Sequence, residues 1–538
     1  MNEIPMHLKP NVVFEPLIDK WYAWSHLISP ATAAMNIVGR HLTIMESFLL
    51  APNIHAEAVL NPKMRGGPFM DLPVDRVDEV KQLQEETQRN RANMVGFAKA
   101  VRELDRLLAS EAKGFGLEPL YEKVSPTLKG YVELFYDRNN NPAFRFFESL
   151  LYKSQFHSKA AQSLNLWVTN NDERPFVLST PRLNDPNAIS LDIPFDHPGI
   201  DELAKMKRSP QTLGYIKALL GISRAQEPLF DTFFTEEALP VYNKYTGESI
   251  RMRYFGHACI LIETKDVAIL SDPLISYYGY QSDIEHFSDS DLPDVIDYVI
   301  ITHNHQDHIL FETLLPLRHK IKNIVVPRTR GGRLEDPDLK LMFNSIGFNN
   351  IIEIDEMETV KFKDTTITGI PFTGEHSDLN IVSKSCHLIE IGRFKLLFMA
   401  DSRILEPALY KHIYEQVGTV DVIFLGMECD GAPLTWLYGP LLTKKVPRDQ
   451  DNTRRLNGSD CVRGMALVDI FKPKEVYVYA MGQEPWVEFI SSIKYTDDSN
   501  PIVQSNKLVN ICKQRGIVAE RLYGEKEILY KRYTDVEA

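Results

Sequence analysis

The string THNHQDH at residues 302–308 places three of the chain's fifteen histidines, with an aspartate, inside six positions. It follows the apolar run DYVII, so we expect it where a buried strand ends and a helix begins. On extended chain His303 and His305 can turn their rings toward one ion, while Asp307 and His308 begin the next turn and face a second position. The string therefore predicts two neighbouring metal positions. The alternative, a helix N-terminus with incidental histidines, would explain one histidine but not the full string.

Two metals need further ligands, and later strand ends offer acidic ones. Asp401 closes the apolar run KLLFMAD, and Glu375 follows the strand-like TTITGIPF. Buried carboxylates at such places are costly unless they are paired or bound to metal. We predict Asp401 and Glu375 as ligands, with His376 competing for the place of Glu375. Glu428, in FLGMECDG, is either a ligand or a substrate-facing carboxylate.

Two residues are expected to support the site rather than bind metal. Asp272, in AILSDPL, is predicted to orient the histidine loop through hydrogen bonds. His257, in FGHAC, is predicted to line the pocket. The polar segment 444–460 is expected to be a solvated loop, with a cover over the site as the alternative.

The chain divides into two parts with different sequence patterns. Its 538 residues exceed one hydrophobic core, and the pattern changes near Tyr245. Residues 1–245 are predicted to form a mixed, largely helical domain, with a strong apolar stripe over 74–113 and a proline-rich surface stretch over 173–199. Residues 246–538 alternate short strands with helices, which predicts an α/β sandwich of two sheets flanked by helices.

Composition excludes several classes of protein. A net charge of −13 argues against a nucleic-acid binder. The five cysteines are widely spaced, which fits a reducing cytoplasm better than a disulfide framework or a zinc ribbon. We see no secretory signal and no apolar run long enough to span a membrane, so we expect a cytoplasmic protein without membrane contact.

From about residue 250 to 490 the chain resembles the metallo-β-lactamase superfamily. The resemblance is carried by FGHACILIET, ILSDP, the HxHxDH string at 303–308, and ADS at 400–402. In most hydrolases of that superfamily a histidine is the third ligand of the first metal, and a later histidine binds the second. Here Glu375 occupies the third place and no histidine follows His412. A more anionic, harder ligand set favours iron over zinc.

With those departures, nearly the whole chain resembles the diiron amino-acid β-hydroxylases of the chloramphenicol-biosynthesis type; YAWSHLISPATAAMN at 22–36 carries the likeness in the N-terminal part. The resemblance implies a dinuclear non-haem iron oxygenase that hydroxylates the β-carbon of an amino acid held as a thioester on a carrier domain of a nonribosomal peptide synthetase. It implies two iron ions cycling between ferrous and ferric states under an oxo or carboxylate bridge, O2 as co-substrate, an external electron donor, and an N-terminal domain for dimerisation and carrier docking.

On this reading His303, His305, Glu375 and Asp401 hold one metal. Asp307, His308 and a bridging Asp401 hold the other, and Glu375, Asp401 and Glu428 are the residues nearest the chemistry. Two alternatives remain at this point. One is a zinc-dependent hydrolase of the same fold, acting on a thioester, lactone or phosphodiester. The other is a docking module without catalysis.

Overall fold

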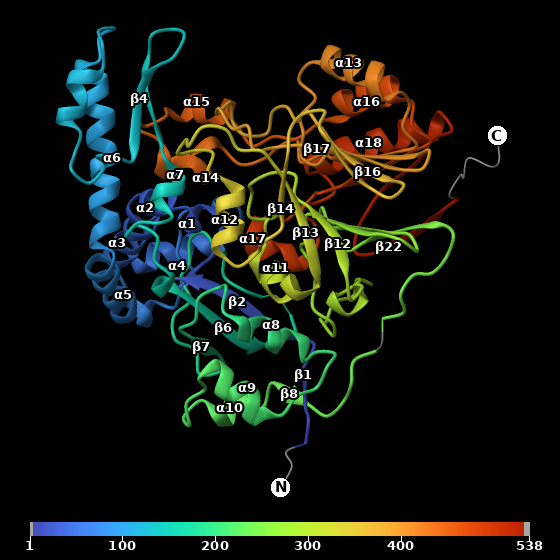
Figure 1. Cartoon of the computed structure of the whole chain (residues 1–538), viewed down its shortest axis with the longest axis horizontal. Coiled ribbons are helices and arrows are strands. Elements are labelled where there is room, and N and C mark those ends of the chain that lie inside the picture. The colour runs from blue at the N-terminus through green and yellow to red at the C-terminus, as the bar shows by residue number, and fades with distance from the viewer. Residues whose placement is uncertain (1–3, 172, 241, 532–538) are drawn as a thin grey trace.

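The computed structural model describes residues 4–171, 173–240 and 242–531. In the N-terminal half, β2 (Val12–Ile18) pairs antiparallel with β6 (Gln162–Val168) at the centre of a sheet ordered β3-β2-β6-β7. The outer strands are β3 (Trp21–Tyr22) and β7 (Ile189–Leu191). Helices fill the long connection between β3 and β6, as Figure 1 shows, so this half is largely helical, as predicted.

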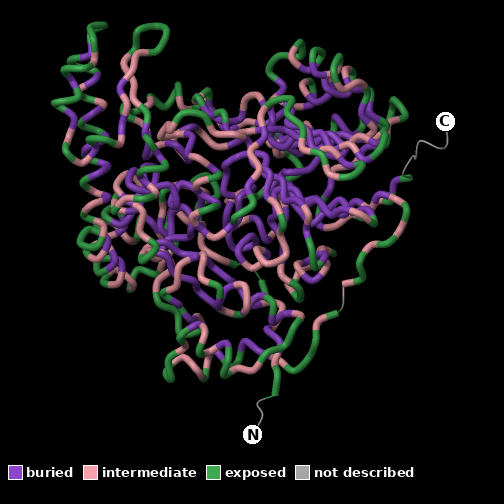
Figure 2. The backbone as a smooth tube through the Cα atoms, viewed as in Figure 1, coloured by how far each residue is buried: buried purple, intermediate pink, exposed green. Residues whose placement is uncertain are grey.

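The helical stripe predicted over 74–113 forms two helices rather than one. They are α5 (Val77–Asn90) and α6 (Ala92–Glu111), and the break falls at Arg91, whose Nε donates to Asp19 at 2.8 Å. The predicted stripe on α6 is buried except at Leu107, which is partly exposed. The far end of α6 and the hairpin of β4 (Val132–Tyr136) and β5 (Pro142–Phe146) project from the main body (Figures 1 and 2).

The C-terminal half contains two seven-stranded sheets packed face to face. The first is ordered β14-β13-β12-β11-β10-β9-β22 and includes β9 (Ile250–Tyr254), β10 (Ile260–Glu263), β13 (Ile321–Pro327), β14 (Ile351–Ile354) and β22 (Lys526–Tyr530). The second is ordered β15-β16-β17-β18-β19-β20-β21 and includes β15 (Thr359–Phe362), β17 (Cys386–Ile391), β20 (Glu475–Tyr479) and β21 (Val518–Arg521). Their inner faces bury apolar side chains such as Ile262, Ile300, Leu396 and Phe424 in one core. The strands that lead to the site are β11 (Ala268–Ser271), β12 (Ile296–Ile300), β16 (Thr365–Ile370), β18 (Phe394–Phe398) and β19 (Val422–Gly426).

Helices cover both outer faces, which completes the predicted αββα sandwich. The second sheet is covered by α13 (Pro407–Val417), α16 (Cys461–Phe471) and α18 (Asn500–Gln514). The first sheet is covered by α11 (Phe311–Leu317) and α12 (Leu339–Ser345). The apolar core beneath α11 and α12 continues without a break into the N-terminal half, so the two halves share one core.

A buried ionic network fastens the two halves together around Glu312 on α11. Its carboxylate accepts hydrogen bonds from Tyr22 at 3.0 Å, Tyr277 at 2.7 Å and Arg174 at 2.8 Å. Arg174 also lies 3.6 Å from Glu15, and its guanidinium carbon lies 3.5 Å from the centroid of the Phe489 ring. Glu312 follows the histidine string by four residues, so this network anchors the helix that begins where the string ends.

None of the helices in the described part of the chain combines the length and the apolar character needed to cross a bilayer.

Candidate metal centre

The predicted ligands come together at one edge of the sandwich, where strands of both sheets end. The histidine string follows β12 of the first sheet, and Asp401 and Glu428 follow β18 and β19 of the second. Parallel neighbours within each sheet present their carboxyl ends at the same edge. The fold thereby brings together residues that are about a hundred positions apart in the sequence.

Three groups of side chains, which share His303 and His308, have ligand atoms close enough to hold an ion. Within each group those atoms lie within 4.8 Å of one another: His303, His305, Glu375 and His376; His303, His308 and Asp401; and His257, Asp307 and His308. His305 Nδ1 lies 3.1 Å from His303 Nε2 and 3.0 Å from Glu375 Oε1. His308 Nε2 lies 3.0 Å from Asp401 Oδ2, which is itself 3.7 Å from His303 Nε2. Asp401 therefore lies between the two halves of the site.

Each histidine of the string has one ring nitrogen held by an outer partner and the other facing the shared space. His308 Nδ1 lies 2.9 Å from Asp272 Oδ2, and because a carboxylate only accepts, this nitrogen carries the proton. Asp272 also accepts from the amide of Thr302 at 2.8 Å and from its hydroxyl at 2.7 Å. The Thr302 hydroxyl oxygen lies 3.0 Å from His303 Nδ1. The lone pairs of His303 Nε2 and His308 Nε2 are thus left for a metal, as outer partners of metal-binding histidines usually arrange.

His257 lies beside Asp307 at the edge of the site. The Gly482 amide donates to His257 Nδ1 at 3.1 Å, so the neutral ring carries its proton on Nε2. That atom lies 3.2 Å from Asp307 Oδ2. The arrangement favours a supporting role for His257, because a protonated nitrogen cannot bind metal.

The backbone is strained at the turns that carry these residues. Several non-glycine residues in or beside the site have positive φ angles, among them His257 at 48°, Asp272 at 32°, Glu375 at 66° and Ala400 at 45°. Such conformations cost about 1–3 kcal/mol each and persist where surrounding structure fixes them, often at functional sites. Gly426, at the end of β19, permits a close approach: a Cβ there would lie 2.7 Å from Asp401 Oδ1.

Burial and mutual charge perturb the ionisation of these groups. Burial lowers the pKa of His303 well below its usual value. Burial lowers the pKa of His308, but the charges of Asp401 and Asp272 outweigh burial and raise this pKa well above its usual value. Burial raises the pKa of Glu375, but the charge of His305 helps to outweigh burial and lower this pKa well below its usual value. Burial raises the pKa of Asp401. Burial and the nearby carboxylates raise the pKa of Glu428 well above its usual value.

A cavity of about 190 Å³ opens onto the ligands. Glu428 lines it but belongs to none of the three ligand groups found among the described residues, so its metal binding stays a prediction. The predicted loop 444–460 contains a short helix, α15 (Arg448–Thr453), and its end contributes Arg455 and Leu456 to the cavity wall. The segment 444–460 therefore forms part of the wall of the metal cavity.

Sequence reasoning missed two residues that contact the ligands. Tyr438, on α14 (Leu434–Tyr438), places its hydroxyl 3.0 Å from His305 Nε2, and Thr302 bridges Asp272 and His303. Nothing in the sequence near Tyr438 marks it, because it lies over a hundred residues after His305. Thr302 was within the string and could have been found from the outer partners that metal-binding histidines need.

The donor set fits a carboxylate-rich dinuclear centre. Asp401 Oδ1 is buried and has no hydrogen-bond partner among the described residues. An unpaired buried carboxylate oxygen is costly, and a metal ion would satisfy it. Histidine nitrogens mixed with several carboxylates suit iron.

Comparison with known proteins agrees with this geometry. The family model described as "Diiron non-heme beta-hydroxylase N-terminal domain" matches residues 7–238, and the model "Beta-lactamase superfamily domain" matches residues 268–432. The chain is 36% identical to the 4-amino-L-phenylalanyl-[CmlP-peptidyl-carrier-protein] 3-hydroxylase of Streptomyces venezuelae, over 96% of this chain and 98% of that protein. The crystal structure of CmlA, a diiron beta-hydroxylase from Streptomyces venezuelae, superposes with a TM-score of 0.91 and 35% identity over 98% of this chain and 100% of that one.

The predicted fold and the resemblance are confirmed, and the zinc hydrolase and the docking module are set aside. A largely helical N-terminal part followed by a metallo-β-lactamase fold, matched along nearly its whole length, makes this chain a member of the diiron non-haem β-hydroxylase family: an enzyme with a diiron cofactor.

Proposed function

We propose that this enzyme hydroxylates the β-carbon of an amino acid held as a thioester on a peptidyl carrier domain, with dioxygen as co-substrate and an external reductant. The observation that carries the proposal is Glu375, which lies 3.0 Å from His305 Nδ1 at the place where hydrolases of this fold have histidine. We assign His303, His305, Glu375 and Asp401 to one iron, and Asp307, His308 and Asp401 to the other. When bound, the irons supply the activation of dioxygen; the protein supplies their ligands and the position of the substrate.

The chain's own residues hold the substrate beside the ligands. Trp436, Leu437 and Ile493 give the 190 Å³ cavity an apolar wall suited to an aromatic side chain. Glu428 and Asp430 line the same cavity and can accept hydrogen bonds from the substrate's α-ammonium group. His376 Nδ1 lies 2.9 Å from Glu375 Oε2, which supports Glu375 as the ligand and His376 as its partner.

A tethered substrate needs a passage to the surface. A second cavity of about 150 Å³ adjoins the first, and the two share Gly66 and Ser492 in their walls. Gly66 belongs to the N-terminal half, so both halves border this passage. We propose residues 1–245 as a dimerisation and carrier-docking domain and residues 246–538 as the catalytic domain.

Exposed apolar side chains of the N-terminal half support dimerisation. Leu50, Ile54 and Leu60 are 80%, 60% and 83% exposed on or at the ends of α3 (Leu42–Leu50) and α4 (Pro52–Leu60). Large exposed apolar side chains often mark interfaces. We also place the enzyme in the cytoplasm, since its five cysteines are all free and four of them are buried.

Intact-mass analysis of carrier domains tests the function. The iron-loaded full-length enzyme is incubated with reductant, air and carriers bearing different amino acids, starting with the 4-aminophenylalanyl group named for the Streptomyces relative. We expect a gain of one oxygen atom on the carrier-bound amino acid and none on the free amino acid. Equal turnover of free and tethered amino acids would contradict carrier dependence.

A further inference from the structure

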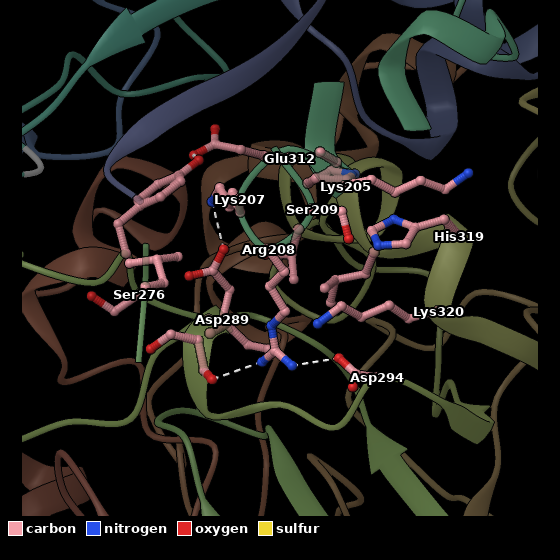
Figure 3. Close-up of a pocket in the computed structure, with 18 residues that line it drawn as sticks. Lys205, Lys207, Arg208, Ser209, Ser276, Asp289, Asp294, Glu312, His319 and Lys320 are labelled. Carbon is pink, nitrogen blue, oxygen red and sulfur yellow. Dashed lines mark hydrogen bonds and ion pairs between the residues drawn. The ribbon is translucent and has the colours of Figure 1, made fainter. Parts of the chain in front are cut away.

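A third cavity, of about 250 Å³, lies between the two halves and shares no lining residue with the metal cavity. Its walls come from the end of α8 (Pro198–Lys205), from η6 (Asp289–Asp291), and from α11 with the following η7 (Arg318–Lys320). Figure 3 shows charged side chains meeting in its interior from these elements.

The charges that line it are paired with one exception. Lys207 pairs with Asp289, and Arg208 pairs with Asp294. The remaining acid, Glu312, is held by Arg174 at 2.8 Å, and Lys205 pairs with Glu202 outside the cavity at 2.7 Å. Lys320 is the remaining charged side chain of the lining, and it has no ion-pair partner among the described residues.

Lys320 is half-buried and its ammonium points into the cavity in Figure 3. It makes no hydrogen bond or ion pair with any described residue. Burial, and then the charge of Arg208, lower the pKa of Lys320 to about 8, although the charges of Asp289 and Asp294 oppose this shift. A partly buried ammonium without a counter-ion is unfavourable, so an anion entering the cavity would be stabilised.

The rest of the lining indicates the kind of anion. Ile275, Pro316 and Leu317 provide an apolar wall opposite a single uncompensated charge. Three further atoms of the lining are buried and have no hydrogen-bond partner among the described residues: Ser276 Oγ, His319 Nδ1 and Asp289 Oδ1. One spare positive charge balances one negative charge, which favours a carboxylate over a doubly charged phosphate ester.

We propose that this cavity is a binding site for a small organic monoanion, an acid with an apolar body whose carboxylate pairs with Lys320. Such a ligand would contact α11 through Thr313, on the helix that follows the histidine string. It would therefore lie against the same helix that Glu312 fastens to the N-terminal half. The proposal stands independently of the substrate of the diiron centre.

The probe for the test is 4-bromobenzoate, with 4-bromobenzyl alcohol as its neutral analogue and phenyl phosphate as the dianion. Crystals of the full-length enzyme soaked in 4-bromobenzoate should show an anomalous bromine peak beside Leu317, whatever the probe does at the metal centre. Calorimetry should show a binding step that Lys320→Met weakens about 10-fold or more, since an ionic hydrogen bond is lost. Lys320→Arg should keep that step, which separates loss of charge from misfolding.

Lys322→Met is the matched control, because Lys322 is an exposed lysine two positions along that pairs with Asp297 outside the cavity. It should bind the probe as the unaltered enzyme does. The proposal is overturned by a cavity without bromine, by equal binding of the neutral alcohol, or by Lys320→Met binding as well as Lys322→Met. Tighter binding of phenyl phosphate than of the benzoate would overturn the assignment to a monoanion.

Discussion

The hydroxyl of Tyr438 lies 3.0 Å from His305 Nε2, on the opposite side of the ring from the Nδ1 atom that faces Glu375. When the Tyr438 hydroxyl accepts from Nε2, the lone pair of His305 Nδ1 is left for metal. Tyr438→Phe keeps the buried ring and removes the partner. We expect iron affinity to fall by about 10- to 100-fold, as is typical when an outer partner of a metal-binding histidine is lost. Iron retained per chain during titration with a chelator measures the change.

Tyr477→Phe is the control for this variant, because Tyr477 is also buried but its hydroxyl donates to Glu475 at 2.8 Å, not to a site residue. It should retain iron as the unaltered enzyme does. Equal iron loss from both variants would mean that Tyr438 stabilises the fold and does not orient His305.

Glu375→His tests whether one carboxylate decides between iron and zinc. The substitution restores the imidazole found in hydrolases of this fold and removes one negative charge, so the site becomes softer and less anionic. We expect the variant, produced in medium containing both metals, to shift toward zinc and to lose hydroxylation. Metal analysis of the purified protein measures the shift. Unchanged iron content with full hydroxylation would contradict the assignment of Glu375.

Gly426→Ala tests how closely β19 must approach the ligand Asp401. The added Cβ would lie 2.4 Å from the Ala400 carbonyl oxygen and 2.7 Å from Asp401 Oδ1, so the turn bearing Asp401 has to move. We expect substantial iron loss from a folded protein, seen as an unchanged circular dichroism spectrum with lower metal content. Gly516→Ala is the control, since a Cβ there meets nothing within 4 Å, although its φ of 76° adds some strain. Full iron content in the Gly426 variant would show that the turn adjusts without cost.

The string THNHQDH could be placed from sequence because its ligands and its strand-to-helix setting are local. Glu375 and Asp401 could be found because each follows an apolar strand, where an unpaired carboxylate needs an explanation. Tyr438 could not, since its contact with His305 depends on how α14 packs, and no local pattern encodes that. The same holds for Gly426, whose role depends on the distance between neighbouring strand ends.

The N-terminal half shows the same limit at the level of the fold. Its helices follow from apolar periodicity, but the pairing of β2 with β6 joins segments about 150 residues apart, and no turn sequence specifies it. The core shared by the two halves could not be predicted either, because the sequence of a buried apolar residue does not show which half packs against it. Length alone suggested separate cores.

Arg174→Met tests the ionic network that fastens the halves. The variant leaves Glu312 buried without its cation, whereas Glu15 keeps its 2.8 Å pair with Arg182. Breaking a buried pair in this way costs about 3–5 kcal/mol. We expect the free energy of unfolding in urea to fall by that order. The control is Arg145→Met, because Arg145 and Glu133 form a pair that is 46% and 43% exposed, and such pairs contribute at most about 1 kcal/mol. Equal effects of the two variants would contradict the proposed anchoring.

Glu148 gives the junction a dependence on pH. On α7 (Glu148–Leu151), its carboxylate accepts from the Ser29 hydroxyl at 2.7 Å and from the amide of Asp338, the N-cap of α12, at 3.1 Å. Burial raises the pKa of Glu148 from 4.5 to about 7. A raised folded-state pKa stabilises the fold fully below pH 4.5, and this stabilisation is lost as the pH rises through about 7.

Glu148→Gln removes that titration while keeping an oxygen that can accept the Ser29 bond. The shift corresponds to roughly 3 kcal/mol at most. The unaltered protein should therefore lose stability relative to Glu148→Gln between pH 5 and pH 8, by an amount of that order. Urea unfolding at several pH values measures the difference, and Glu85→Gln, at an exposed glutamate on α5, should follow the unaltered protein throughout. Parallel pH profiles for Glu148→Gln and the unaltered protein would mean that Glu148 ionises in the folded protein as it does in the unfolded chain, and that the junction does not sense pH through it.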